Sequence, residues 1–398
     1  MKKLFSFFNR SRLHPFVDDE TRQKRIGIAV YILTVVLSIV YIVVGHQYAV
    51  RDIPEFTAYS TQLIVQAKVV SIGETFTEEQ MMADQIMVST TTLFTARVTE
   101  GEFKDVELEA MHLDDPFSPY HLRDVRVGDN VFLQYSPQDD VDVRWVLQEY
   151  RRTDTLLIMG IFVFILMIVF GRSKGVHTIV ALVFTCLAIF AVFIPAILSG
   201  KNIYLFTVMT GAFIIAMTIL VVNGANRKSL CSGIGCMCGF AASGILSLIM
   251  DRLLGLTGLI DEDSVYLLYL NTDQPINLNA IIFAAITIGA LGAIMDVSIS
   301  ISSSLNEVFQ TDPWLEAGDI MRSGMNIGRD IIGTMSNTLL LAYIGSSLSL
   351  VVLLIAYNDS LAVLLNKEMI VVEILQSLVG VAGLLLVIPL TSFVCSIV

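Results

Sequence analysis

The chain has 398 residues, of which 55% are hydrophobic and 16% are charged, and its mean hydropathy is +0.71. An ordinary soluble domain carries about 25% charged residues, so this composition excludes a soluble globular protein. The formal net charge of −12 disfavours nucleic acid as a partner, because phosphates are bound by basic surfaces. The apolar residues fall in blocks of about 20, the length of helix that crosses a bilayer. We therefore expect a multi-pass α-helical membrane protein.

The N-terminal region predicts a membrane anchor. Residues 1–25 are polar and basic, and the first apolar block follows at about residues 26–44. No small-residue cleavage site stands out after this block, so we expect a retained transmembrane helix at 26–46 and not a signal peptide. Basic residues favour the cytoplasmic side of a membrane, which places residues 1–25 in the cytoplasm.

Segment 47–152 is then expected outside the cytoplasm. It holds 19 acidic and 9 basic residues between Arg51 and Arg152. Runs of alternating apolar and polar residues, separated by turn signals, predict short strands. The runs lie at 63–72, 88–98, 106–111, 131–135 and 143–147. They predict an acidic domain that is a small β-barrel or sandwich. His112 and His121 are too isolated to indicate a catalytic site.

Seven further apolar blocks follow, at about 154–171, 177–198, 203–222, 230–250, 278–300, 331–356 and 370–394. With the anchor they predict eight transmembrane helices, seven of them within 153–398, and a cytoplasmic C-terminus. The basic residues of the loops agree with this orientation. Two loops are longer. Loop 251–277 is expected outside with a short helix on the membrane surface, and loop 309–328 inside with a short amphipathic helix opening at Asp312.

The five cysteines do not predict a cofactor. Cys231, Cys236 and Cys238 have a spacing that invites a metal site, but a structural zinc site needs four ligands and no histidine lies near them. We expect these side chains to pack as small apolar residues. The sequence therefore predicts neither a metal nor another cofactor.

The sixth apolar block carries the strongest functional candidates, because ionisable groups inside a membrane are expensive and are usually functional. Four polar residues are spaced i, i+4, i+7 and i+11, so a helix places them on one face. They are Asp296, Ser300, Ser303 and Glu307. This stripe suits a hydrated path for an ion. The alternative is a structural carboxylate, with serine hydroxyls bonded to their own helix.

Neighbouring blocks extend this candidate relay. In the seventh block, Asp330, Thr334 and Asn337 share a helix face. Asp330 could equally serve the positive end of the helix dipole at the start of a helix. In the eighth block, Glu373 lies near the outer end, where its side chain could reach the interface.

Four glycines are expected to let helices approach closely. Gly235 and Gly239 belong to a ladder of small residues in the fifth block, spaced every four positions. Gly289 and Gly292 continue the polar face of the sixth block toward the outside. Packing is the expected role of all four.

Three stretches, 292–307, 328–340 and 373–391, resemble signatures of the YibE/F-like family of bacterial membrane proteins. Segments 101–104 and 127–131 of the outer domain also fit that family. The resemblance covers most of the chain from about residue 60, and it implies a multi-pass protein of the bacterial plasma membrane. It leaves the chemistry open.

A shorter set of residues is similar to the protein-export membrane protein SecF. The set joins Asn277, Asp296 and Glu307 to Arg329 and Thr334. The likeness implies an analogy with proton-driven exporters, whose membrane carboxylates titrate. The additional helices expected at about 203–250 do not fit that family.

Two functions remain open. The first is a proton- or cation-coupled transporter or exporter in which Asp296 titrates, with a small solute or ion that the sequence does not identify. The second is a membrane-anchored assembly or export-assisting factor whose outer β-domain binds a protein. An enzyme is not expected, because the chain lacks a phosphate-binding loop, a His-Glu-x-x-His helix and a Gly-x-Ser-x-Gly elbow.

Overall fold

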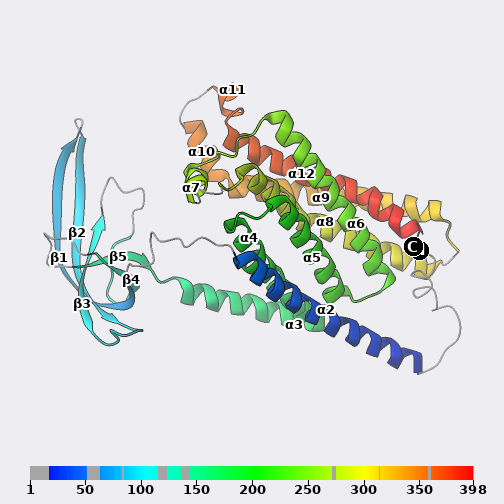
Figure 1. Ribbon diagram of the computed structural model, residues 1–398, viewed down its shortest axis with the longest axis horizontal. Coiled ribbons are helices and arrows are strands. Elements are labelled where there is room, and N and C mark those ends of the chain that lie inside the picture. Colours follow the sequence, from blue (N-terminus) through cyan, green and yellow to red (C-terminus); the bar gives the residue numbers. More distant parts are fainter. Residues whose placement is uncertain are drawn as a thin grey trace. The chain divides into compact units, whose positions relative to one another are not determined.

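The computed structural model describes residues 18–51, 63–82, 85–114, 123–136, 144–270, 275–312, 314–356 and 360–397. The chain forms two compact units. One is Glu55–Leu166, and the other joins Met1–Pro54 to Met167–Val398 (Figure 1). The first contains the strands and the second is helical, so we describe each unit separately.

The first unit is a closed five-stranded barrel with the strand order β1-β2-β3-β5-β4, one of the two forms that the alternating pattern predicts. The strands are β1 (Ile64–Met82), β2 (Gln85–Val98), β3 (Glu107–Asp114), β4 (Asn130–Tyr135) and β5 (Trp145–Tyr150). All neighbours are antiparallel except β3 and β5. Because side chains alternate between the two faces of a strand, Val65, Ala67 and Val69 of β1 point into the core with Phe94 and Leu133.

The remaining elements are helices. They are α2 (Asp18–Val50), α3 (Thr153–Leu187), the π-helical segment η1 (Ala188–Phe193), α4 (Ile194–Leu198), α5 (Ile203–Asn223), α6 (Arg227–Leu254), α7 (Glu262–Leu270), α8 (Leu278–Thr311), α9 (Ala317–Ser346), α10 (Leu348–Ala356), α11 (Leu361–Leu364) and α12 (Glu368–Ile397). Within the described residues, six segments are long and apolar enough to cross a membrane: Gly27–Val50, Thr153–Leu198, Ile203–Asn223, Arg227–Leu254, Leu278–Thr311 and Glu368–Ile397. The chain is therefore a multi-pass membrane protein.

One of these segments contains two of the expected spans. Thr153–Leu198 has 46 residues, and a straight helix of that length would extend about 69 Å, roughly twice the hydrocarbon thickness. Arg172 interrupts it with φ 51° and ψ −130°. Immediately after the break, Gly175 is buried against the backbone carbonyl of Met167, so close that a β-carbon would collide with it. The chain thus reverses sharply between the two halves.

Asparagine begins three of the long helices. The side chains of Asn202, Asn226 and Asn277 accept hydrogen bonds from the backbone N–H three residues later, at 3.1, 2.9 and 3.0 Å. Each bond satisfies one of the N–H groups that a helix start leaves without a partner. These caps fix where α5, α6 and α8 begin.

The amphipathic helix expected in 309–328 is present, but it begins after Asp312 and is not short. Helix α8 continues to Thr311, and α9 begins at Ala317 and runs without interruption to Ser346. The expected seventh span at 331–356 is instead divided between α9 and α10 at Ser347. Helix α9 is strongly amphipathic, so a hydropathy window sees its first half as a polar loop. Helix α7 confirms the short helix expected in 251–277.

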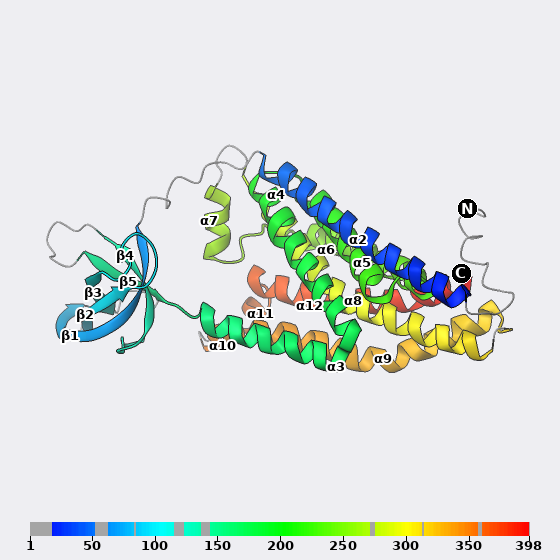
Figure 2. The same cartoon turned by 90° about the horizontal axis from the view of Figure 1, so that it is seen from below.

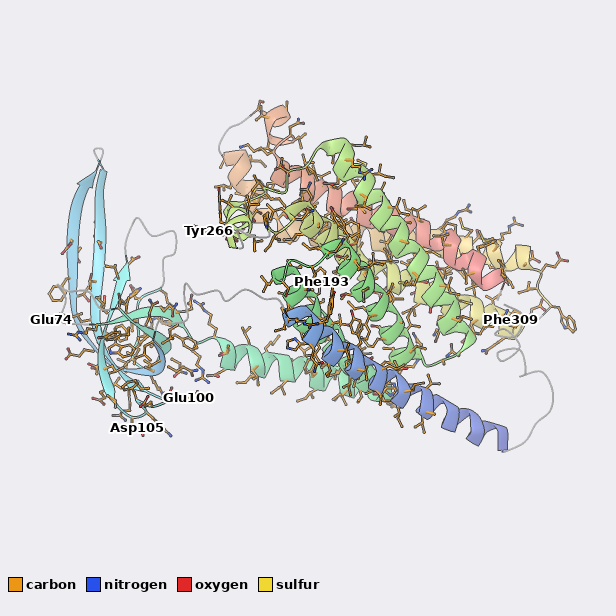
Figure 3. The ribbon with its side chains drawn as sticks, viewed as in Figure 1. Glu74, Glu100, Asp105, Phe193, Tyr266 and Phe309 are labelled. Atoms are coloured by element: carbon orange, nitrogen blue, oxygen red, sulfur yellow. The ribbon has the colours of Figure 1, made fainter. Side chains whose placement is uncertain are left out.

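The core of the helical unit lies between α6, α8, α9 and α12, with Ile294, Ile301, Val387 and Ile388 at most 1% exposed. Helix α2 begins and α12 ends at the same end of this unit (Figures 1 and 2). Phe309 near the end of α8 lies at that end as well, and Tyr266 of α7 lies at the opposite end (Figure 3).

Candidate functional site

Helix α8 has two different faces. Its core face carries Ile294, Val297 and Ile301, all fully buried. On the opposite face, Asp296 and Glu307 are exposed. The remaining members of the predicted stripe share that outer face. They are the half-buried Ser300 and Ser303 and the exposed Gly289 and Gly292. The helical period therefore places the predicted residues together, but it turns them away from the core of the chain.

The carboxylates of this outer face take part in no ion pair with the described side chains. Among the residues that the structure describes, neither Asp296 nor Glu307 forms an ion pair. A charged group near the centre of a bilayer costs about 2.5–3.5 kcal/mol on insertion scales. In a membrane, this face must therefore be covered by water or by protein.

Helix α9 presents a second polar face. Its buried side carries Ile320, Gly324 and Gly328. Asp330, Thr334 and Asn337 lie on the opposite, exposed side. The Thr334 hydroxyl donates to the Ile331 carbonyl of its own helix at 3.0 Å, which is the structural role weighed for such hydroxyls. Asp330 and Asn337 remain available to a ligand.

In the first half of α8, three helices bring polar groups together around Gly289. A β-carbon added to Gly289 would lie 3.2 Å from Nε2 of Gln376 on α12 and 3.3 Å from the hydroxyl of Tyr343 on α9. Glu373, half-buried one turn before Gln376, lies within electrostatic reach of Tyr343. The structure thus adds Tyr343 and Gln376 to the predicted Glu373. Sequence patterns missed both, because neither is charged.

A buried polar centre lies inside the core and was also missed. The Ser298 hydroxyl donates to the Ser232 carbonyl of α6 at 2.8 Å and shares a 3.0 Å hydrogen bond with the Thr391 hydroxyl of α12. Ser298 and Thr391 are both fully buried. One signal could have found Ser298, because it stands four residues after Ile294 and three before Ile301, in phase with the apolar core face.

The four glycines differ in what surrounds them. A β-carbon on Gly235 would collide with Thr391, and one on Gly239 would lie 3.0 Å from Ile294 and Val387. Gly289 lies against Gln376 and Tyr343, as described above. A β-carbon on Gly292 would meet no described heavy atom within 4 Å. Close helix contact is thus present at the first three positions and absent at Gly292.

The structure offers no arrangement typical of a metal centre within its described residues, since no three His, Cys, Asp or Glu side chains gather there. All five cysteines are free thiols, and Cys231, Cys236 and Cys395 are buried among apolar groups. His121 lies outside the described residues.

Comparison with known proteins identifies the helical part of the chain. No curated protein and no solved structure matched it. The family model described as YibE/F-like protein matches residues 159–398, which is more than half of the chain. The match includes α8, α9 and α12 and confirms the resemblance seen in their sequences, so the chain belongs to the YibE/F-like family.

Proposed function

We propose that the protein couples the movement of a proton or cation to transport or export across the membrane, with Asp296 as the titrating carboxylate. One observation carries the proposal. The outer face of α8 holds two carboxylates, and neither forms an ion pair with a described basic side chain. Such a face is costly in lipid and useful along a water-filled path.

The remaining polar groups extend the path in both directions. Glu373, beside Tyr343 and Gln376, forms its outer mouth. No described heavy atom lies within 4 Å of a β-carbon placed on Gly292, so there is room for water beside α8 between this mouth and Asp296. Toward the other end, Glu307 and the exposed face of α9 complete the inner part. Those inner residues are Ser300, Ser303, Asp330, Thr334 and Asn337.

The test is whether Asp296 changes its protonation state. Difference infrared spectroscopy of the purified protein, titrated between about pH 4 and pH 9, would follow carboxyl bands. We expect a band that shifts with pH and with the transported ion and that disappears in Asp296→Asn. Glu316→Gln, an exposed carboxylate at the start of α9, should leave that band in place. An Asp296→Asn spectrum identical to wild type would overturn the proposal.

The topology that we propose has eight crossings and both termini in the cytoplasm of a bacterium. The break at Arg172 divides Thr153–Leu198 into two crossings. Helices α9 and α10 supply one more, which is too polar in its first half to be recognised by composition. The shared end of α2 and α12 supports an even number of crossings (Figure 2).

A second candidate function rests on the strand pair β1 and β2. β1 pairs with β4 only over Ile64–Lys68, whereas it pairs with β2 as far as Met82. The pair therefore continues beyond the barrel as a two-stranded ribbon (Figure 1), in which β1 after Lys68 and β2 before Thr90 pair with no further described strand. A lone hairpin is marginally stable in water, which favours pairing with a partner.

The charge of the ribbon indicates which partner fits. Residues 73–89 contain four acidic residues and no lysine, arginine or proline. The acidic residues are Glu74, Glu78, Glu79 and Asp84. Lysine and proline are common protections of a free strand edge, and their absence suits the addition of a basic, extended segment of another protein.

The two functions can be separated in cells. Reversing the charge at Glu74, Glu78 and Glu79 to lysine should abolish the cellular role if the ribbon recruits a partner. The same change should spare a transporter whose relay is intact. Asp296→Asn should give the opposite pattern. Transport should be lost, while chemical crosslinking in cells should still join the ribbon to its partner.

A further inference from the structure

A hollow lies where α6 begins and α8 ends. Its walls come from α6, α8, α9 and α12, and its empty space, with the open solvent at its mouth included, is ≈ 320 Å³. Four polar or aromatic side chains define it. They are Arg227, Lys228, Asn306 and Phe309. Phe309 marks this end of the helical unit in Figure 3. None of the four belongs to the carboxylate path proposed above.

Arg227 is held in place by an aromatic ring. Its guanidinium carbon lies 4.4 Å from the ring centroid of Phe309, within the range of a cation–π contact. Stacking on a ring leaves the edge of a guanidinium free to donate parallel hydrogen bonds. That edge matches two oxygens of a phosphate or carboxylate group.

The charge around the hollow is net positive. Lys228 lies within electrostatic reach of Lys174 from the turn after Arg172, and of Glu307 on α8. Glu307 offsets one of these charges. In the described part of the chain, neither Arg227 nor Lys228 forms an ion pair. Lys174 adds to the positive potential at Lys228, which favours an anion beside it.

An apolar groove starts at the same turn of α6. It runs between α5 and α6 and encloses ≈ 1170 Å³ up to its mouth. Asn226 and Ser229 stand at its beginning, and its length is lined by apolar residues. Among these are Ile219, Leu230, Ile234 and Met237. A hydrocarbon chain fits such a surface, and its charged end would lie beside Arg227.

We propose that this hollow is a binding site for a phosphate group, with the headgroup of an anionic phospholipid as its occupant. Arg227 donates bidentately to the phosphate, Lys228 neutralises it and Asn306 contributes an amide donor. The groove between α5 and α6 takes one acyl chain. Basic pockets between membrane helices are suited to this chemistry. Free phosphate shares the recognition of the headgroup but not the groove.

The test uses the full-length protein in a neutral detergent. Lipid retention is measured by native mass spectrometry with phosphatidylglycerol, with phosphatidylcholine of the same chains, and with inorganic phosphate at matched ionic strength. The double variant Arg227→Gln/Lys228→Gln should bind phosphatidylglycerol about tenfold or more weakly, the effect of losing charge-assisted hydrogen bonds. Arg252→Gln removes an exposed arginine at the other end of α6 and should change nothing.

Each outcome decides between the sources of the anion. Retention of phosphatidylglycerol that depends on Arg227 and Lys228, without an effect of inorganic phosphate, supports the lipid site. An equal dependence for inorganic phosphate assigns the hollow to a free anion and overturns the lipid. If the double variant does not fold, Phe309→Leu tests the stacking alone. Unchanged phosphatidylglycerol binding in Phe309→Leu, or in the double variant, overturns the proposal.

Discussion

Ser298 and Thr391 share a hydrogen bond of 3.0 Å between α8 and α12, in a region that excludes solvent from both. The same Ser298 hydroxyl reaches the Ser232 carbonyl at 2.8 Å. Hydrogen bonds to the Ser298 hydroxyl thus connect α6, α8 and α12. A hydrogen bond in an apolar core depends on geometry and therefore fixes how the helices are rotated and registered.

Replacing Ser298 by alanine should destabilise the helical unit. The change leaves the Thr391 hydroxyl without this partner, and interhelical hydrogen bonds in membranes are worth about 1 kcal/mol. We expect a lower midpoint of thermal unfolding in detergent. Ser304→Ala is the matched control, because Ser304 lies on the same helix and donates to its own backbone at the Ser300 carbonyl. Equal midpoints for the two variants would contradict the assigned role.

The sequence predicted which polar residues of α8 share one face. It did not predict that this face points away from the neighbouring helices. The spacing of Asp296, Ser300, Ser303 and Glu307 places them together on any helix. Which side meets the neighbouring helices depends on tertiary packing, and there Ser298 and Ser302 are buried despite their polarity. Hydrophobicity alone cannot distinguish a serine that joins helices from one that lines water.

The strands and the helix ends were also predicted only in part from the sequence. Alternation revealed every strand of the barrel, because each strand has one buried face. It missed the full length of β1, since residues 73–78 are exposed and pair only with β2. The continuity of the expected amphipathic helix with the seventh span was missed, because the first half of α9 packs on α12 through Gly328 and Ile388 and is not marked by its own hydropathy.

The contrast between Gly235 and Gly292 predicts opposite effects of the same substitution. A β-carbon at Gly235 would collide with Thr391, whereas Gly292 has open space. Gly235→Ala should therefore destabilise the protein by about 1–3 kcal/mol through overpacking. Gly292→Ala should be neutral or slightly stabilising, because alanine favours a helix. Thermal unfolding of both variants checks this, and a stable Gly235→Ala would show that α6 and α12 can separate.

The barrel should lose stability in mild acid because of His112. This side chain is 3% exposed, and its burial lowers the pKa below the ordinary value of 6.5, against the opposing effect of Asp114 and Asp124. The unfolded chain then binds a proton that the folded barrel resists. The contribution of His112 to the stability of the barrel is fully present above pH 6.5. It is lost as the pH falls from there through the lower folded-state pKa of His112.

Trp145 can report this loss, because it packs against the barrel core. The chain has two tryptophans, so a Trp314→Phe background isolates the signal of Trp145. Denaturant unfolding at pH 7 and pH 5 should give a smaller difference in His112→Gln than in the parent. If both proteins lose the same stability between these pH values, His112 is not the group that titrates.

The turn at Arg172 makes a prediction about the membrane topology. Arg172 has φ 51°, a strained conformation for a residue other than glycine. The chain reversal at Arg172 brings Gly175 against the backbone of Met167. If each half of Thr153–Leu198 crosses the membrane, Arg172 lies on the cytoplasmic side. Glu102 of the barrel and Lys201 before α5 then lie on the other side. In a background without the native cysteines, Glu102→Cys and Lys201→Cys should react with an impermeant maleimide added to intact cells, and Arg172→Cys only after the membrane is opened. Labelling of all three from one side would mean that this segment does not cross the bilayer twice.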